Sequence, residues 1–488
     1  MAEEKSLPTL DARTKWSYCI GATGRDAAYA FISLFLMTYV QYTMKLTVAQ
    51  FSVISLCMVI CLVWDAINDP MMGIIIENSH FKAGKYKPWI LAGCILNALV
   101  ITALFTFRPT GWGFVAFFGV SYLLWGMTYT MNDISYWGML PSLSSDAATR
   151  NSLVTIMSIF ICLGQFVVAG VVPTIIAGNA VNAFRWSAYA VAMGFILFQI
   201  LVVVGCKERP RNLEKEAKAE KLTLGTMFRI FKRNDQLIAS GVAELLFHVG
   251  SSLLTMFGAN FFFFEFGYST GGSLIFLFTV MYGLGTLFSQ ALYDTMTKKF
   301  SRMKLLSIAT VVEIIGYLAL MACGYLFPMS AVAVNIIGFV IFFFQGFSNL
   351  IIIVMLNNTI EYDEYRFHER HDSVIAAIRS FAVKLGTALE QGLVTVVLII
   401  SGIYTASQQI SSLETDAGKG LLTSEQVTSA ADEFIRNVEP YQTLLLRLGM
   451  VLFPIIALVG AWLLLKKKYR IDEAEYQRIV DEIAERHE

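Results

Sequence analysis

Long apolar stretches alternate with short polar connections along almost the whole chain of 488 residues. About twelve of these stretches reach the roughly 20 mostly apolar residues that a helix needs to span a bilayer. Only 15% of the residues are charged, whereas a soluble domain carries roughly 25%. The sequence therefore predicts an all-α membrane protein with twelve transmembrane helices. The stretches lie at 17–44, 49–77, 86–107, 112–140, 152–176, 183–205, 238–267, 270–295, 303–327, 330–360, 373–402 and 441–466.

Basic residues gather in every second connection between these stretches. By the positive-inside rule, these connections and both termini face the cytoplasm, and we expect a multi-pass protein of a plasma (inner) membrane. Residues 1–16 are polar, so we expect the first apolar stretch, and not a cleavable signal peptide, to direct the chain to the membrane. The basic groups lie at 82–87, 207–233, 298–304, 366–370 and 466–470.

A polar segment at 206–237 divides the stretches into six and six. We therefore expect an N-terminal six-helix half at 1–205, a cytoplasmic middle loop at 206–237 and a C-terminal six-helix half at 238–466. The second half includes a long exterior loop at about 403–440, for which a helical cap and a solvated linker are both open. The tail 467–488 carries a helical stripe of apolar residues and predicts an amphipathic cytoplasmic helix.

One cytoplasmic turn supports an internal duplication. Glu77 is followed at +5, +8 and +10 by lysines, and Asp294 is followed at the same spacing by basic residues, the last two being Arg302 and Lys304. We expect each acid to pair with its bases and clamp the helix ends, although chance in a basic loop gives the same pattern. Two six-helix halves are a layout in which transporters bind substrate near the middle of the membrane.

Two aspartates four residues apart, Asp65 and Asp69, fall within the second stretch and share one helix face. Ionisable groups in the hydrocarbon zone usually mark a transport pathway or an ion pair. Two bare carboxylates repel, so either one is protonated or a cation neutralises them. Asn68, and Thr130 of the fourth stretch, offer further oxygens that suit Na⁺ or Li⁺. The alternative is that the aspartates form ion pairs with basic residues at the cytoplasmic end.

The aspartate pair has no counterpart in the second half of the chain. A shift by the 217 residues that relate the two basic turns places Tyr282 opposite Asp65 and Thr286 opposite Asp69. The carboxylates are therefore not part of the shared scaffold, which favours a single cation site in one half.

A second group of polar residues indicates where a sugar binds. Asp133 and Trp137 lie four residues apart on the fourth stretch. A carboxylate accepts hydrogen bonds from sugar hydroxyls, and an aromatic face covers the apolar side of a sugar ring. Asp26 of the first stretch follows Arg25, which either pairs with it or contacts the substrate. A lipid-facing side chain is the alternative for Trp137, and Lys384 either neutralises the aspartates or lies at a helix end.

Several other classes of protein are disfavoured. Seven scattered cysteines form neither a disulfide nor a zinc framework. No Walker-type phosphate loop is present, which argues against ATP drive. An enzyme that holds Mg²⁺ between Asp65 and Asp69 needs further acid clusters on other stretches, and none is seen. The residues favour secondary transport of a small polar solute without a cofactor, and a sugar sensor is the non-transporting alternative.

Four motifs closely resemble those of the glycoside–pentoside–hexuronide:cation symporters, a family of the major facilitator superfamily that includes melibiose permease. They are long, and they come from both halves, so the resemblance covers nearly the whole chain. The motifs are WDAINDP at 64–70, GKYKPWI at 84–90, WGMTYTMNDISYWGMLP at 125–141 and TIEYDEYRFHERHDSVIAAIRSFAVKLG at 359–386.

The resemblance implies a major facilitator fold and symport of a sugar, glycoside, pentoside or hexuronide with Na⁺, Li⁺ or H⁺. Membrane lipids are the other expected partners, no nucleic acid is expected, and we expect a monomer that is not an enzyme. The implied residues are Asp65, Asn68, Asp69 and Thr130 for the coupling cation, with Asp65 and Asp69 as the Na⁺ ligands, Arg25, Asp26, Asp133 and Trp137 for the substrate, and Lys384 as a charge partner near both.

Two positions depart from melibiose permease. Ser158 stands where that protein has an arginine, and Asn349 stands where it has a tryptophan. Both departures argue against a melibiose-type galactoside. Arg25 and Arg379 leave an anionic hexuronide open, and a neutral pentoside or oligosaccharide fits as well. Carriage of a lysolipid, as in a vertebrate branch that resembles this family, is the alternative within transport.

Overall fold

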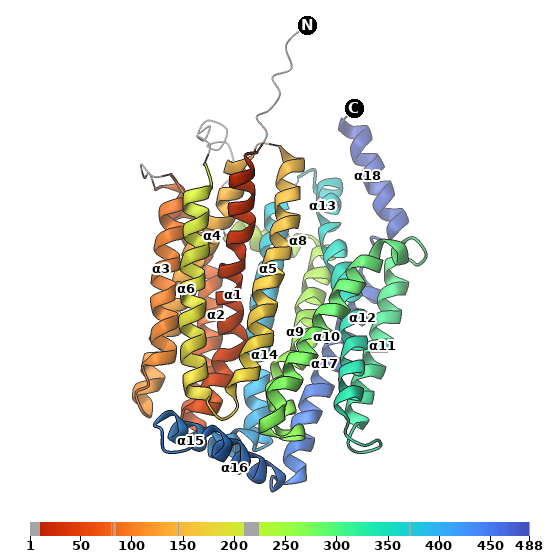
Figure 1. Cartoon of the computed structure of the whole chain (residues 1–488). Coiled ribbons are helices and arrows are strands. Elements are labelled where there is room, and N and C mark those ends of the chain that lie inside the picture. The colour runs from red at the N-terminus through yellow and green to blue at the C-terminus, as the bar shows by residue number, and fades with distance from the viewer. Residues whose placement is uncertain are drawn as a thin grey trace. The chain divides into compact units, whose positions relative to one another are not determined.

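The computed structural model describes residues 10–79, 81, 84–144, 146–208, 224–369 and 372–487. Within these ranges it contains twelve helices of 20 or more residues, close to the twelve apolar stretches of the sequence (Figure 1). They are α1 (Ala12–Thr43), α2 (Val48–Glu77), α3 (Lys87–Thr106), α4 (Trp112–Leu143), α5 (Ala147–Ile176), α6 (Ala180–Gly205), α9 (Asp235–Phe266), α10 (Tyr268–Thr297), α11 (Arg302–Ala322), α12 (Ala331–Asn357), α14 (Asp372–Ile400) and α17 (Pro440–Lys468).

Five shorter helices lie in the connections and in the tail. They are α8 (Leu224–Arg233), α13 (Thr359–Phe367), α15 (Ile403–Gly418), α16 (Ser424–Arg436) and α18 (Glu473–His487). The last is the amphipathic helix predicted for the tail, and it packs against α13 with Ile471 and Ile479 buried. Residues 209–223 of the predicted middle loop lie outside the described residues. The predicted all-α fold class is confirmed.

Eleven of the long helices in the described part of the chain are apolar enough to cross a membrane. The remaining one, α1, has the necessary length at 32 residues, but it is more polar because it carries Arg25, Asp26 and Gln41. All three side chains are buried. The polar residues of α1 therefore face protein and not lipid, as is usual for charged groups inside membrane helices.

Local signals in the sequence explain where several helices begin. At the start of α2, the Thr47 hydroxyl accepts a hydrogen bond from the Gln50 N–H, and the Gln50 side chain accepts one from the Thr47 N–H, at 3.3 and 3.0 Å. This reciprocal arrangement satisfies two backbone donors that lack partners within the helix. A proline in the first turn of α3 also favours a helix start, because the N–H that proline lacks would have no partner within the helix there.

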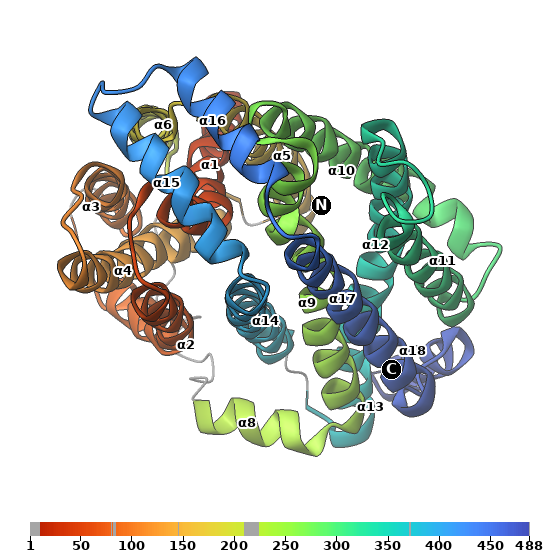
Figure 2. The same cartoon turned by 90° about the horizontal axis from the view of Figure 1, so that it is seen from below.

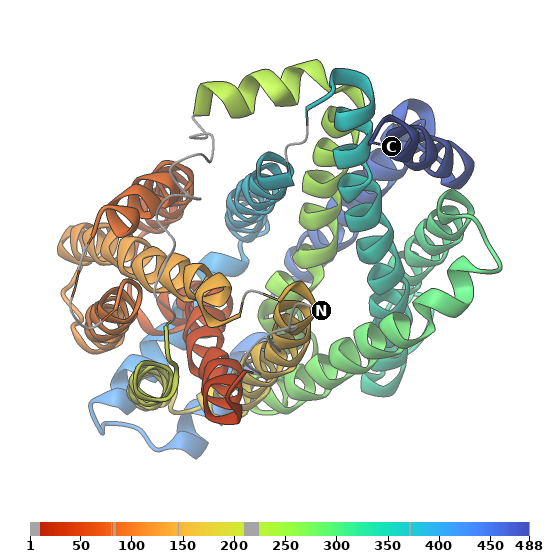
Figure 3. The ribbon, with the colours of Figure 1, turned by 90° about the horizontal axis from the view of Figure 1, so that it is seen from above.

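The chain divides into two compact units. Unit 1 comprises Met1–Ala219 with Ile410–Val427, and unit 2 comprises Glu220–Gln409 with Thr428–Glu488. In unit 1, α1 packs against α5 and α6, α3 packs against α4 and α6, and α2 packs against α4. In unit 2, α9 packs against α14 and α17, α11 packs against α12 and α17, and α10 packs against α12 (Figure 2 and Figure 3). The same pairings recur in the same chain order, as an internal duplication requires.

The predicted exterior loop contains two helices, α15 and α16, in place of an unstructured linker. Residues 403–440 were predicted to belong to the C-terminal half, whereas residues 410–427 pack as part of unit 1. The physical reason is a set of hydrogen bonds between α15 and the ends of α1 and α6, described below.

In the two turns with the repeated acid–base pattern, the helix starts are capped by Glu208 and Glu473. Glu77 and Asp294 were the expected acids. Glu208, which follows α6, accepts hydrogen bonds from the Lys85 and Lys87 N–H groups at the start of α3, at 2.8 and 3.0 Å. Glu473, which follows α17, accepts one from the Arg302 N–H at the start of α11, at 2.6 Å, and pairs with its guanidinium at 3.1 Å.

This arrangement changes the expected pairing of the turns. Arg302 pairs with Glu473 and not with Asp294, and the Glu77 side chain lies outside the described residues. Free N–H groups at a helix start attract a carboxylate wherever in the chain it originates. Gly84 permits the close approach in unit 1, since it has a φ of +112° and a Cβ there would lie 2.8 Å from the Glu208 carboxylate.

Candidate functional site

Helices α2 and α4 of unit 1 bring the predicted cation residues together. The Thr130 hydroxyl on α4 donates a hydrogen bond to Asp69 Oδ1 on α2 at 3.0 Å. One turn earlier on each helix, Asp65 lies against Gly126, where an added Cβ would be 2.7 Å from Asp65 Oδ1. Both carboxylates of α2 therefore face α4. The glycine is required by this close approach, because any side chain there would displace the Asp65 carboxylate.

Asn68 supplies a third polar group next to the carboxylate pair in sequence. It is buried, and its Nδ2 atom has no hydrogen-bond partner within the described residues. A buried amide without a partner carries a desolvation cost, and its oxygen is a possible cation ligand. No group of three or more His, Cys, Asp or Glu side chains suited to a metal occurs in the part of the chain that the structure describes. The structure thus brings the Asp69 carboxylate and the Thr130 hydroxyl together with Asp65 one turn away, and the place of Asn68 among the cation ligands stays a prediction.

The corresponding helix pair of unit 2, α10 and α12, carries neutral groups at the matching positions. Thr286 donates its hydroxyl to the carbonyl of Tyr282 on the same helix at 2.9 Å, and the Tyr282 ring packs on Phe342 of α12 at 4.8 Å. Further along, Ser289 contacts Gly346 of α12, as Asp65 contacts Gly126 in unit 1. The two helix pairs share their close packing, and the unit 2 positions that correspond to Asp65 and Asp69 carry Tyr282 and Thr286 in place of carboxylates.

Arg25 joins the two aspartates predicted to bind sugar. Its guanidinium pairs with Asp26 Oδ2 at 2.8 Å and with Asp133 Oδ1 at 3.0 Å, so that α1 and α4 are linked by one cation. The Arg25 side chain is 2% exposed, whereas the Asp133 side chain is 36% exposed. Arg25 is therefore a buried partner of both acids, whereas part of the Asp133 side chain remains exposed.

Two aromatic rings of α4 flank the same guanidinium. The Cζ atom of Arg25 lies 4.6 Å from the centre of the Tyr136 ring and 5.5 Å from that of Trp137. Trp137 is 39% exposed, so one part of its surface remains open. Carboxylate and indole thus lie one turn apart on α4, both with accessible surface and both positioned by Arg25.

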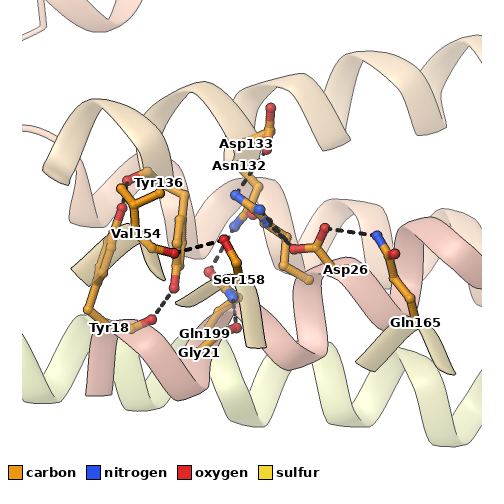
Figure 4. A network of polar contacts seen from close by, with 11 residues as sticks. Tyr18, Gly21, Asp26, Asn132, Asp133, Tyr136, Val154, Ser158, Gln165 and Gln199 are labelled. Atoms are coloured by element: carbon orange, nitrogen blue, oxygen red, sulfur yellow. Dashed lines mark hydrogen bonds and ion pairs between the residues drawn. The ribbon is translucent and has the colours of Figure 1, made fainter. Parts of the chain in front are cut away.

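The surrounding polar groups of unit 1 hold these helices in place, and the sequence analysis did not identify them. Gln165 of α5 donates to Asp26 Oδ1 at 3.5 Å. Asn132 donates to the Gln199 side chain at 3.2 Å, and Gln199 donates to the Gly21 carbonyl at 2.9 Å, as Figure 4 shows. Ser158, at the position of the absent arginine, donates its hydroxyl to the Val154 carbonyl of its own helix at 2.8 Å (Figure 4). Gln165 and Gln199 lie inside apolar stretches, and this polar position in the sequence could have identified them as contacts between helices.

Unit 2 contains its own polar contacts between α9 and α14. Arg379 pairs with buried Glu244 at 3.4 Å, and His248 lies 3.5 Å from buried Glu390. Lys384 lies on α14 of the same unit. Its predicted place beside the carboxylates of unit 1 stays a prediction.

Comparisons with known proteins agree with this architecture. The family described as "MFS/sugar transport protein" matches residues 17–473. The lactose permease of Lactobacillus delbrueckii subsp. bulgaricus is 24% identical over 491 aligned residues, which cover 96% of this chain and 72% of that protein. The raffinose carrier protein of Pediococcus pentosaceus is 23% identical, and the match covers 99% of this chain and 73% of that protein.

Solved structures show the same fold. A D-xylose-proton symporter matches with a TM-score of 0.58 at 15% sequence identity, covering 89% of this chain and 99% of that one. The predicted major facilitator fold is thereby confirmed. The relatives are transporters, which confirms the prediction that the protein is not an enzyme. The chain therefore belongs to the MFS/sugar transport protein family, as a major facilitator transporter of the glycoside–pentoside–hexuronide type.

Proposed function

We propose that this multi-pass sugar transporter works by cation-coupled symport, in which a sugar or glycoside and Na⁺, Li⁺ or H⁺ cross the membrane together by alternating access. The observation that carries the proposal is the contact between Asp69 and Thr130 at 3.0 Å, with Asp65 one turn away on the same face of α2. Two acids on one face of an apolar helix, next to a hydroxyl of the neighbouring helix, provide the hard oxygen ligands that a coupling cation needs.

The coupling follows from electrostatics. Asp65 and Asp69 repel when both are ionised, and inside a membrane protein little water screens them. A monovalent cation or a proton removes that repulsion, and hard oxygen ligands suit Na⁺ and Li⁺. Thr130 and Asn68 supply neutral oxygens beside the carboxylates, so the cation would be shared between α2 and α4.

The sugar site follows from the groups around Arg25. Asp133 accepts hydrogen bonds from sugar hydroxyls, and Trp137 covers the apolar face of the ring. Arg25 fixes the orientation of Asp133 and Asp26 through its two ion pairs. Because Thr130 and Asp133 lie on the same helix, a cation that orders α4 also orders the sugar site.

A neutral glycoside is the substrate class that this chemistry favours. Both arginines that left a hexuronide open are already paired, Arg25 with two aspartates and Arg379 with Glu244. The relatives named for lactose and raffinose support a neutral sugar as well. We further propose that the protein is a monomer in the plasma membrane. Its basic connections indicate that both termini lie in the cytoplasm.

The test is transport by the purified protein in proteoliposomes. A panel of neutral glycosides, a hexuronide and a lysolipid is offered with an inward Na⁺ gradient, an inward proton gradient, or neither. We expect one neutral sugar to accumulate above its external concentration only with one of the cation gradients. Equal accumulation with and without both gradients would overturn symport, and accumulation of the lysolipid alone would overturn the sugar assignment.

A further inference from the structure

The segment between α14 and α17 carries two helices, and we call residues 403–436 the strap. Its first helix, α15, begins in unit 2 and ends in unit 1, and its second helix, α16, returns to unit 2. The chain therefore crosses between the units twice within the strap, in addition to its crossing in the middle loop. Each of its helices ends in a contact with a different unit.

In unit 1, the contact is made by Glu414 of α15. Its carboxylate accepts hydrogen bonds from the Gly178 and Ala180 N–H groups at the start of α6, both at 2.7 Å. Asn179, the residue before α6, makes no side-chain cap of its own. Glu414 is completely buried, so a carboxylate more than 230 residues away in the chain serves as the N-terminal cap of α6.

Neighbouring contacts hold the same end of α15 in unit 1. The Thr415 hydroxyl donates to the Thr43 carbonyl at the end of α1, at 3.2 Å. A Cβ on Gly418 would lie 3.1 Å from the Val181 side chain of α6, so the backbones come close. The end of α15 is thus attached to both α1 and α6.

In unit 2, Asp432 of α16 makes the equivalent contact. Its carboxylate accepts hydrogen bonds from the Tyr268 and Ser269 N–H groups at the start of α10, at 2.6 and 3.2 Å. The residue before α10 is Gly267, with a φ of +94°, which has no side chain with which to cap the helix. Both anchors of the strap therefore replace a missing cap on a transmembrane helix.

We propose that the strap restrains the transport cycle. Glu414 fixes it to the exterior end of α6, Asp432 fixes it to the exterior end of α10, and together they limit how far these ends separate when the protein opens outward. The inference rests on the alternating access proposed above, in which the two halves rock against each other. Each strap acid accepts two bonds from backbone N–H groups, and Asp432 also accepts one from the Ser269 hydroxyl, so removing an acid removes the main bonds of its anchor.

The mechanics follow from the stiffness of α15. From Ile403 to Glu414 the helix spans roughly 16 Å, at about 1.5 Å per residue. It follows α14 after a two-residue turn of Ser401 and Gly402, with Gly402 at a φ of +77°. A short stiff helix with one end joined covalently to α14 and the other bonded to α6 does not lengthen, so outward opening must either pivot it at Gly402 or release Glu414.

The test compares exterior distances in the full-length protein. Spin labels are placed at Lys45 and Leu326, two exposed positions in the α1–α2 and α11–α12 connections, after the native cysteines are replaced by serine. Double electron–electron resonance then gives the distance distribution for Glu414→Ala and Asp432→Ala. The matched control is Glu433→Gln, which changes an exposed acid of α16.

We expect the longer-distance population to rise roughly fivefold relative to the shorter one when either anchor is removed, the order of effect of one lost helix cap. The control variant keeps the original distribution. If Glu414→Ala does not fold, Glu414→Gln replaces it, because the amide oxygen keeps one of the two bonds and a smaller shift in the same direction is expected.

If the folded Glu414 and Asp432 variants keep the distance distribution of the unsubstituted protein, the proposal that the strap restrains the transport cycle is wrong. Sugar counterflow is measured on the same samples. If the unsubstituted protein moves no sugar, the proposed function fails. If it moves sugar while the distances in the variants stay unchanged, only the strap fails.

Discussion

The Thr130 hydroxyl on α4 donates a hydrogen bond to Asp69 Oδ1 on α2, at 3.0 Å. This contact joins the helix that carries the acidic pair to the helix that carries Asp133 and Trp137. Since a hydrogen bond to a carboxylate is stronger than one between neutral groups, it fixes the register of the two helices at this level. Any ion that binds Asp69 also acts on α4 through Thr130.

Replacing Thr130 by valine removes the hydroxyl and keeps the shape. A lost hydrogen bond of this kind costs about 0.5–1.5 kcal/mol, so we expect the cation concentration for half-maximal sugar counterflow to rise about 3- to 10-fold. The matched control is Thr286→Val on α10, where the hydroxyl bonds the Tyr282 carbonyl of its own helix and not a carboxylate. An equal rise in both variants would show that Thr130 has no special role.

A methyl group at Gly126 provides a steric test of the Asp65 position. The added Cβ would lie 2.7 Å from Asp65 Oδ1, so the carboxylate must move. We expect Gly126→Ala to lose cation stimulation of sugar counterflow by at least about 10-fold, the effect of roughly 1.4 kcal/mol.

The control for this steric test lies on the same helix. At Gly119 an added Cβ would meet only Cys57 Sγ at 3.6 Å, an ordinary contact. Gly119→Ala should therefore keep both cation stimulation and sugar affinity. Full stimulation in Gly126→Ala, measured at matched expression, would place Asp65 outside the cation site.

Asp133→Asn tests the sugar site. The change removes the charge that strengthens hydrogen bonds to sugar hydroxyls, while Arg25 retains its ion pair with Asp26. We expect saturable sugar binding to disappear, as measured by titration calorimetry, while the melting temperature of the protein in detergent stays close to that of the unsubstituted form. Normal affinity in this variant would refute the assignment of Asp133.

Trp137→Ala tests the aromatic face. An aromatic contact is worth about 0.5–1.5 kcal/mol beyond its buried area, so we expect sugar affinity to fall by about 3- to 10-fold or more. Trp186→Ala on α6 is the control, because that side chain is 67% exposed and no substrate role is assigned to it. If both variants lose the same affinity, the loss reflects general packing and not stacking on the sugar.

The apolar stretches predicted the long helices well because the transmembrane length and hydropathy leave few alternatives. The errors fall where apolar residues do not continue a helix. Residues 324–327 were included in the ninth stretch, yet α11 ends at Ala322. Gly324 has a φ of +83° and begins a turn, so hydropathy alone extended the helix too far.

The sequence also pointed to Asp65, Asp69 and Thr130, since acids in apolar helices are rare and costly. It did not predict that Arg25 pairs with both Asp26 and Asp133, because the second pair joins residues more than 100 positions apart. Caps from distant carboxylates were missed for the same reason. A helix start shows that an acceptor is needed, but not which segment supplies it.

The last prediction concerns the coupling itself. If a cation must neutralise Asp65 and Asp69 before α2 and α4 adopt the arrangement that binds sugar, then removing one carboxylate removes the need for the cation. Linkage requires that sugar tighten the cation by the same factor as the cation tightens sugar. We therefore expect Asp65→Cys and Asp69→Cys each to lose uphill accumulation in proteoliposomes. Sugar should still bind weakly and exchange across the membrane, because Asp133 and Trp137 are unchanged.

Counterflow separates uncoupling from loss of function in these two variants. It needs binding and alternating access but no net cation movement, so its rate should depend on Na⁺ or pH less than about 2-fold in either variant, against a large dependence in the unsubstituted protein. Asp294→Asn at the end of α10 is the matched control, since it removes an acid outside the pair, and it should retain accumulation. If Asp65→Cys or Asp69→Cys still concentrates sugar in a cation-dependent way, that residue is not the coupling ligand and the mechanism must be abandoned.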